Sequence, residues 1–115
     1  MPAINFKKQF APMVEAGVKR QTIRPMRKNR FLCGDTLYLY TGMRTKQCHK
    51  LGETKCLHVH EVRMTESGMK LDGVALAPSG IDQLARDDGF HGVEDFREFF
   101  RNQYGFPFHG QLIKW

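Results

Sequence analysis

The sequence lacks any apolar run long enough to cross a membrane, and no apolar stretch follows Lys7 and Lys8 near its start. A membrane span needs about 20 predominantly apolar residues, and a secretory leader needs an apolar segment behind its basic residues. We therefore expect a soluble cytoplasmic protein without membrane contact. Only three of the 115 residues are cysteine, which excludes a disulfide-rich secreted scaffold and predicts free thiols. Of these, Cys33 follows Phe31 and Leu32 and is expected to be the most buried.

Two kinds of ligand-binding motif are also missing. Neither G-x-x-x-x-G-K-[ST] nor G-x-G-x-x-G occurs, so nucleotide-binding folds built on those loops are not supported. The metal-ligand residue types Cys48, His49, Cys56, His58 and His60 form neither a C-x2-C nor an H-x3-5-H pair, the spacings typical of structural zinc sites. We predict no metal and no cofactor, and we interpret these residues as surface side chains.

The charge is unevenly distributed along a chain whose composition, 41% hydrophobic and 26% charged, is typical of one globular domain over residues 1–115. Residues 1–55 hold 12 basic and three acidic side chains, a formal charge of +9, whereas residues 56–115 carry −3. A basic half of this kind suits a phosphate-facing surface. It favours RNA or a nucleotide-like ligand as partner, and the alternative is a solvated basic face. No obligate protein partner is evident.

Hydrophobic periodicity predicts an α+β domain of about six strands and three helices. Alternation and turn residues indicate strands over 3–6, 21–24, 35–41, 54–65, 69–71 and 110–115. Apolar residues at helical spacing indicate helices over 8–16, 81–87 and 93–101. The polar segment 43–53 is expected to be a long mobile loop. Because strands and helices do not alternate regularly, we expect a small curled sheet or β-barrel with helices over its openings.

Lys19, Thr22 and Arg24 form the most informative constellation of polar residues. Thr22 and Arg24 are two apart in a predicted strand and share a face, and Lys19 lies in the turn before it. A lysine beside a threonine hydroxyl can act as base and nucleophile if burial lowers the lysine pKa. The alternative is a solvated basic strand edge. A second candidate, the glycine turn 41–46 with Arg44 and Lys46, could hold a phosphate or an RNA backbone.

Several segments together resemble ASCH domains of the PUA-like superfamily. They are Phe10-Ala-Pro-Met-Val-Glu-Ala-Gly-Val-Lys-Arg-Gln-Thr-Ile-Arg24, residues 34–46, 56–64, 88–90, 93–96 and 108–115. The ordered set covers nearly the whole chain. The resemblance implies a small PUA-like β-barrel with flanking helices and a cleft that binds RNA or a modified nucleoside.

One enzymatic branch of this family removes the acetyl group from 4-acetylcytidine with a lysine, a threonine three residues later and a glutamate. Lys19 and Thr22 match the first two, and Asp88 stands nearest the third, with Asp87 as a substitute if the register differs by one. The aspartate is one methylene shorter than the family's glutamate.

The function predicted from these observations is binding of RNA or a modified nucleoside in a cleft lined by Lys19, Thr22 and Arg24. Further binding residues are expected to be Tyr38 and Tyr40, which could stack on a base, together with Arg44 and Lys46. The alternative is an amidohydrolase for acylated cytidine with Thr22 as nucleophile, Lys19 as base and Asp88 as the acid. A ribonuclease is a third, less favoured hypothesis.

Overall fold

A computed structural model describes residues 2–115 and contains eight strands and three helices. The elements in chain order are β1 (Ala3–Phe6), α1 (Ala11–Glu15), β2 (Gln21–Pro25), β3 (Thr36–Thr41), β4 (His49–Lys55), β5 (His58–Thr65), β6 (Gly68–Leu71), β7 (Val74–Ala75), α2 (Pro78–Asp87), α3 (Val93–Gln103) and β8 (Phe108–Lys114). The predicted α+β class is confirmed.

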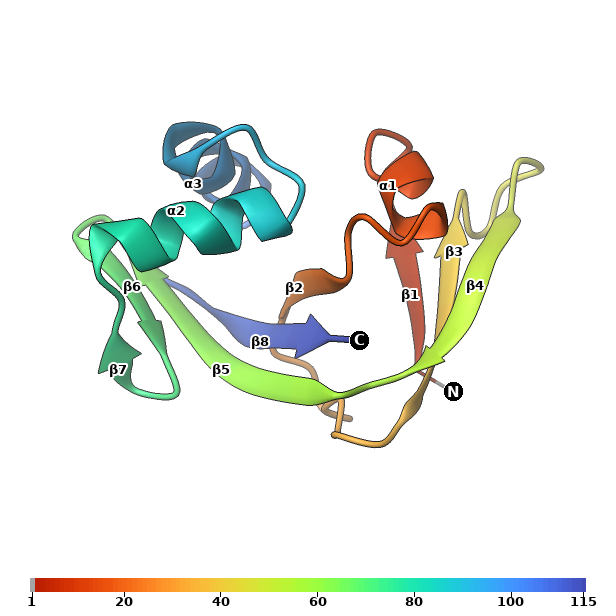
Figure 1. Ribbon diagram of the computed structural model, residues 1–115, viewed down its shortest axis with the longest axis horizontal. Coiled ribbons are helices and arrows are strands. Elements are labelled where there is room, and N and C mark those ends of the chain that lie inside the picture. The colour runs from red at the N-terminus through yellow and green to blue at the C-terminus, as the bar shows by residue number, and fades with distance from the viewer. Residues whose placement is uncertain (1) are drawn as a thin grey trace.

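The strands pair into two sheets, and the chain passes directly from the first sheet into the second where β4 is followed by β5. In the first sheet β3 lies between β1, which is parallel to it, and β4, which is antiparallel. The second sheet is antiparallel with the order β2-β8-β5-β6-β7. Figure 1 shows β4 and β5 following one another from the first sheet into the second. The strand pairs of residues 2–115 do not join into a single closed ring, so the barrel is not established.

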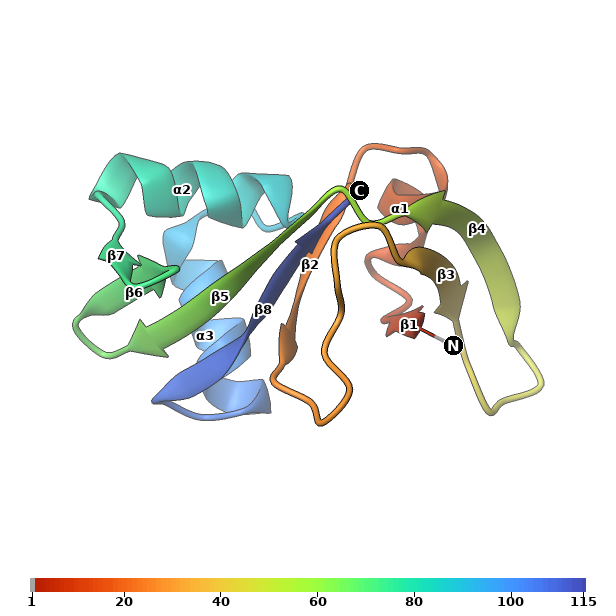
Figure 2. The same cartoon turned by 90° about the horizontal axis from the view of Figure 1, so that it is seen from below.

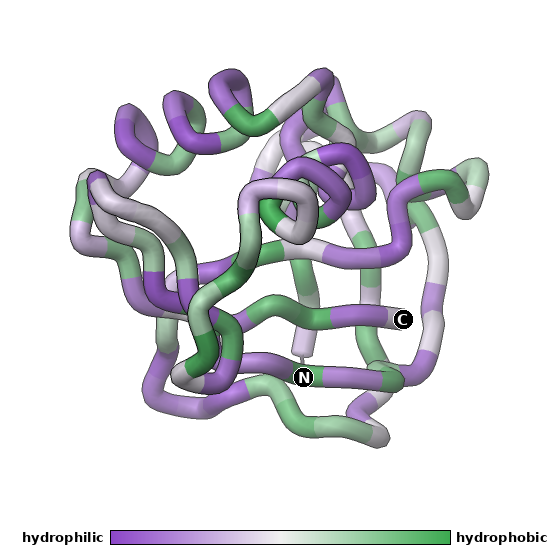
Figure 3. The backbone as a smooth tube through the Cα atoms, turned by 60° about the vertical axis from the view of Figure 1, so that its left-hand side comes forward, coloured by the Kyte–Doolittle hydropathy of each residue, from purple (hydrophilic) through white to green (hydrophobic). Residues whose placement is uncertain are grey.

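The helices cover the second sheet and the inner side of the first. In Figure 1, α2 and α3 lie over β5, β6 and β8, while α1 lies beside β1 and β3. Figure 2, seen from below, shows β5, β8 and β2 side by side with α3 behind β5 and β8. Along the tube in Figure 3 the helices carry both hydrophilic and hydrophobic residues, as expected for helices with one face on a core.

Two hydrophobic clusters form the interior. One packs α2 and α3 on the second sheet, with Phe96, Phe100 and Leu112 at its centre. The other joins α1 to the first sheet and includes Phe6, Phe10 and Trp115. The half-buried rings of Phe90 and Phe99 pack against both clusters. These two rings therefore mark the junction of the two halves of the interior, and the candidate site lies beside them.

Close backbone packing explains one glycine in the second sheet. Gly110 pairs with Pro25 across β8 and β2, and a Cβ atom there would stand 2.1 Å from the Arg24 carbonyl oxygen and 2.8 Å from the Phe108 ring. No other residue type fits without moving β2, because 2.1 Å is far inside van der Waals contact. Glycine thus fixes how closely β2, which carries the candidate site, approaches β8.

The loop expected over 43–53 is wrong for residues 49–53, because β4 occupies 49–55. Every residue of β4 is exposed or half-buried, so this edge strand carries no hydrophobic alternation. The single strand expected over 54–65 is interrupted at Cys56 and Leu57, where the chain leaves the first sheet for the second. The two-residue β7 was not predicted, and the helix expected over 8–16 is shorter, covering Ala11–Glu15.

Candidate functional site

The turn between α1 and β2 buries Lys19. Gly17 ends α1 with φ 76°, and the backbone N–H groups of Val18 and Lys19 both donate to the Met13 carbonyl, at 2.9 and 3.0 Å. This arrangement turns the Lys19 side chain inward, where its ammonium lies 5.0 Å from the centre of the Phe10 ring. The side chain is only 3% exposed. A lysine buried to this extent needs a partner, because an unpaired buried charge is costly.

Asp88, directly after α2, is that partner. Its N–H donates to the Leu84 carbonyl at 3.0 Å, and Gly89 follows with φ 94°, a conformation that favours glycine. The Lys19 Nζ lies 3.0 Å from Asp88 Oδ1 and also donates to the Asp88 backbone carbonyl. The carboxylate is 4% exposed. The end of α2 and the start of β2 are thereby joined by a buried ion pair.

Gln21 completes the surroundings of this pair. Its side-chain amide donates to the Leu84 carbonyl at 3.3 Å and to Asp88 Oδ1 at 3.4 Å. Gln21 is buried, so it holds the carboxylate oriented toward Lys19. The sequence analysis did not identify it, since a glutamine in a short strand carries no signal that separates a buried residue from an exposed one.

Thr22 and Arg24 lie on β2 next to the ion pair. The Arg24 Nε donates to the Thr22 hydroxyl oxygen at 3.0 Å, and the guanidinium lies over the Phe6 ring at 5.0 Å from its centre. Thr22 is buried. Because Arg24 occupies an acceptor site of the hydroxyl, the Thr22 proton is free to be donated elsewhere.

Lys19, Thr22, Arg24 and Asp88 all line one small cavity, which we call the central cavity. Its volume is about 50 Å³, and its wall includes Phe10, Phe90, Phe99 and Tyr104. The cavity can hold a few water molecules, because each needs about 10–15 Å³ of such space. The structure thus brings together the three residues of the predicted catalytic set and Arg24 in one aromatic-walled space.

Burial governs the ionisation of this cluster. Desolvation lowers the pKa of Lys19, opposed by the Asp88 charge and hydrogen bond and assisted by the Arg24 charge. Desolvation raises the pKa of Asp88, opposed mainly by Lys19. Burial also lowers the pKa of Arg24. The first two shifts bring the proton affinities of the amine and the carboxylate closer together than they are in water.

Other residues expected at the site lie elsewhere. Asp87 is exposed and accepts a hydrogen bond from Gln83 at 2.9 Å, so Asp88 is the carboxylate that faces Lys19. Tyr38 and Tyr40 are half-buried on β3 and do not line the central cavity; Lys50 lies over the Tyr38 ring instead.

Arg44 and Lys46 are exposed in the loop between β3 and β4, outside the central cavity. Arg44 has a φ of 67°. The loop itself is ordered by Thr45, whose N–H and hydroxyl both donate to the Gly42 carbonyl.

Sequence analysis missed the aromatic wall. Phe90 follows Asp88 by two residues, and Phe99 belongs to the apolar stripe of α3. That stripe indicated core packing, and nothing in its spacing separates a core ring from one that also faces a cavity.

The cysteines and histidines occupy unrelated positions. Cys33 and Cys48 are exposed and Cys56 is buried, so the expectation for Cys33 is wrong: Cys56 lies where the chain passes between the sheets. Over residues 2–115, no three His, Cys, Asp or Glu side chains are grouped as metal ligands would be. None of the three described helices has the length and apolarity required to cross a membrane.

No protein-family model, curated protein or solved structure matches this chain.

Proposed function

We propose that this chain binds a single nucleoside unit, free or as part of RNA, with its base in the central cavity. The observation that carries the proposal is the gathering of Lys19, Thr22, Arg24 and Asp88 within an aromatic wall. A base needs a flat apolar surface for its face and both donors and acceptors for its edge. Phe10, Phe90 and Phe99 offer the first, and the four polar residues offer the second.

We propose further that the fold is that of an ASCH domain with a PUA-like barrel, as the motif resemblance implies. The basic character of residues 1–55 agrees with a phosphorylated partner. Nothing in the proposal requires a cofactor, a metal or a second protein.

Entry of a base requires the mouth of the central cavity to widen, because about 50 Å³ holds only a few waters. Lys7 lies at this mouth. Its ammonium donates to the Gln103 side chain at 3.0 Å and lies over the Phe99 ring at 5.3 Å from the ring centre. Lys7, Gln103 and the mouth residue Tyr104 are all exposed, so they can change rotamer at low cost in packing.

The binding proposal is tested by calorimetric titration with the four common nucleosides and 4-acetylcytidine. We expect at least one to bind, and Thr22→Val to weaken that binding at least about tenfold, because a lost hydrogen bond in a buried site costs about 1–3 kcal/mol. Thr54→Val on β4 is the matched control, since Thr54 is half-buried outside the central cavity. Absence of binding at millimolar concentration, or equal losses in both variants, contradicts the proposal.

A second candidate, hydrolysis of the amide in an acylated cytidine, is favoured by one observation: the buried ion pair lies beside a threonine whose oxygen is already held by Arg24. In this reaction Lys19 first passes a proton to Asp88, 3.0 Å away, and the neutral amine then takes the proton of the Thr22 hydroxyl. The Thr22 oxygen then forms a bond to the acyl carbon.

Collapse of the resulting tetrahedral intermediate breaks the bond to the exocyclic nitrogen, which receives the proton from Lys19. Water then attacks the acyl-threonine ester and gives a proton to Lys19, and Lys19 passes this proton to the departing Thr22 oxygen, which releases the carboxylic acid and restores the Thr22 hydroxyl. Arg24, whose guanidinium lies beside the Thr22 oxygen, would offset the negative charge that develops on the acyl carbonyl oxygen during attack.

The catalytic candidate is tested by acetate release from 4-acetylcytidine. We expect Thr22→Val to abolish release and Thr22→Ser to retain part of it, because serine keeps the hydroxyl. Asp88→Glu, which restores the longer acid of the enzymatic branch, is expected to change the rate by up to about a hundredfold, the effect of a 1 Å displacement. No release by the wild type, or full activity in Thr22→Val, refutes catalysis and leaves the binding proposal standing.

A further inference from the structure

Two open grooves of opposite charge adjoin the central cavity. The first, which we call the basic groove, has a volume of about 560 Å³ and is lined by Lys7, Lys8, Thr41, Thr45 and Gln47 beside Asn5 and Phe6. It has no acidic residue in its lining. Asn5, Phe6 and Lys7 also line the central cavity, so the two spaces share a wall.

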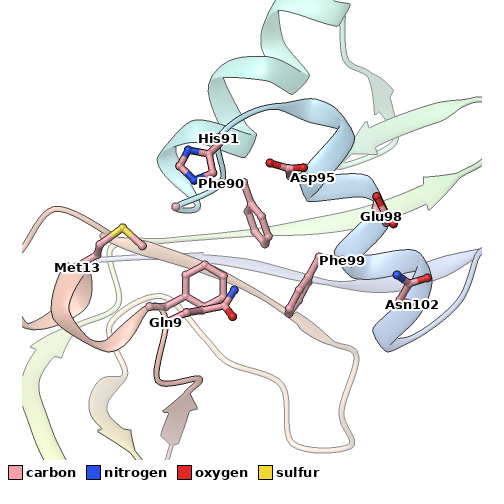
Figure 4. A pocket seen from close by; sticks show the side chains of 10 residues that line it. Gln9, Met13, Phe90, His91, Asp95, Glu98, Phe99 and Asn102 are labelled. Carbon is pink, nitrogen blue, oxygen red and sulfur yellow. The ribbon is translucent and has the colours of Figure 1, made fainter.

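The second, which we call the acidic groove, has a volume of about 510 Å³ and lies between α1 and α3. Figure 4 shows Asp95 and Glu98 on α3 along one side of it, with Met13 and Gln9 across from them and the rings of Phe90 and Phe99 between. No lysine or arginine lines it, and His91 is its only basic side chain. It shares Phe10, Phe90 and Phe99 with the central cavity, and no residue with the basic groove.

The central cavity therefore shares one wall with a groove that attracts phosphate and another with a groove that repels it. A nucleotide whose base occupied the central cavity could reach the basic groove with a phosphate. An RNA strand that continued from the central cavity into the acidic groove would bring a second phosphate toward Asp95 and Glu98, which are exposed and have no lysine or arginine beside them in the lining of that groove. Like charges brought together in this way oppose binding.

We infer that the ligand is a nucleoside monophosphate, or the phosphorylated end of an RNA, with its phosphate held by Lys7 and Lys8 in the basic groove and a second phosphate excluded by the acidic groove. This inference rests on the proposed binding function and narrows it. The two lysines supply the attraction, because the groove's hydroxyls are already engaged: Thr41 donates to the Phe6 carbonyl at 2.8 Å, and Thr45 donates to the Gly42 carbonyl.

Lys7 connects the phosphate to opening of the central cavity. In the structure its amine is held across the mouth by Gln103 and Phe99. A phosphate in the basic groove offers this amine a charged acceptor, which forms a stronger hydrogen bond than the neutral Gln103 amide. Binding of the phosphate would thus release the contact that narrows the entrance for the base.

The experiment compares calorimetric affinities for the four nucleosides, their 5′- and 3′-monophosphates and trinucleotides. For the preferred base we expect one of the monophosphates to bind at least about tenfold more tightly than the nucleoside. Lys8→Ala should remove that advantage and leave the nucleoside affinity unchanged. Lys70→Ala is the matched control, since Lys70 is exposed on β6 and lines none of the three spaces.

The acidic groove is tested by reversing one charge. We expect trinucleotides to bind the wild type no more tightly than the monophosphate, and Glu98→Lys to strengthen trinucleotide binding about tenfold without affecting the monophosphate. Glu94→Lys on the same helix is the control, because Glu94 lines neither groove.

Each failure has a different meaning. Equal affinity for nucleoside and monophosphates, equal effects of Lys8→Ala and Lys70→Ala, or tighter trinucleotide binding by the wild type overturns the inference and leaves nucleoside binding intact. If no nucleoside and no monophosphate binds, the inference and the proposed function both fall.

Discussion

The buried pair of Lys19 and Asp88 predicts a large non-additivity between substitutions at these positions. Their charged atoms lie 3.0 Å apart, with side chains 3% and 4% exposed. Removing one partner leaves the other charge buried, which costs about 3–5 kcal/mol. We therefore expect Asp88→Asn and Lys19→Met each to lower the free energy of unfolding by about 3–5 kcal/mol at pH 7. That is a large part of the roughly 5–15 kcal/mol available to a domain.

The double variant Lys19→Met/Asp88→Asn should lie within about 2 kcal/mol of the wild type, because replacing a buried pair by groups of similar volume is often nearly neutral. The two single losses add to at least about 6 kcal/mol, so the coupling free energy is at least about 4 kcal/mol. Urea unfolding followed by fluorescence measures it, because Trp115, the only tryptophan, is buried against Phe6 with ring centres 5.9 Å apart. Additive effects of the two substitutions, to within about 0.5 kcal/mol, would refute the reasoning.

The difference in unfolding free energy between the wild type and the double variant should change with pH in a direction set by the two pKa shifts. Burial raises the pKa of Asp88 above its ordinary value of 3.8, so above that pH the folded protein holds this proton more tightly than the unfolded chain. The wild type should therefore lose stability relative to the double variant as pH rises from about 4. The lowered pKa of Lys19 acts in the opposite direction: below its ordinary value of 10.5 the unfolded chain holds the proton more tightly, so stability recovers as pH approaches 10.5.

Two further predictions concern the framework. Gly110→Ala should lower the free energy of unfolding by at least about 3 kcal/mol in urea titration, since its Cβ would overlap a backbone carbonyl of β2. Gly52→Ala is the control and should cost less than about 1 kcal/mol, because a Cβ there meets nothing within 4 Å. Similar costs for the two variants would contradict this account. Cys33 and Cys48 should react quickly with a thiol reagent and Cys56 only on unfolding, because burial shields Cys56 and raises its pKa; three equally fast thiols would disprove the placement.

Strands with an apolar face were predictable from sequence, and the polar edge of the first sheet was not. In β3, Leu37 and Leu39 alternate with half-buried neighbours, and the period of two identified the strand. β4 has no buried residue at all. β4 is held by backbone hydrogen bonds to β3, with a register irregularity at Leu39 and Tyr40. Because every residue type can form backbone hydrogen bonds, such a strand produces no hydrophobic pattern in the sequence.

The candidate site was predictable in part for a similar reason. Lys19, Thr22 and Arg24 are close in sequence, so the strand period of two, together with the turn before β2, could place them near one another. Asp88 lies 69 residues from Lys19, and only resemblance to a family suggested that it belonged there. Tyr38 and Tyr40 were assigned to the site because aromatic residues on a strand suit base stacking, but the rings that line the central cavity come from α1, α3 and the segment after α2.

The place of β8 in its sheet bears on how the chain folds. β8 follows every other strand in sequence, yet it lies between β2 and β5 and pairs with both. During synthesis, β2 and β5 each lack their central neighbour until residues 108–114 are available, and the pairing of residues 21–25 with 110–114 closes a very long loop. Such non-local pairing slows folding and leaves strand edges open to association with other chains in the meantime. Assembly of β2 against β8, and with it burial of Lys19 beside Asp88, should therefore be a late step in folding.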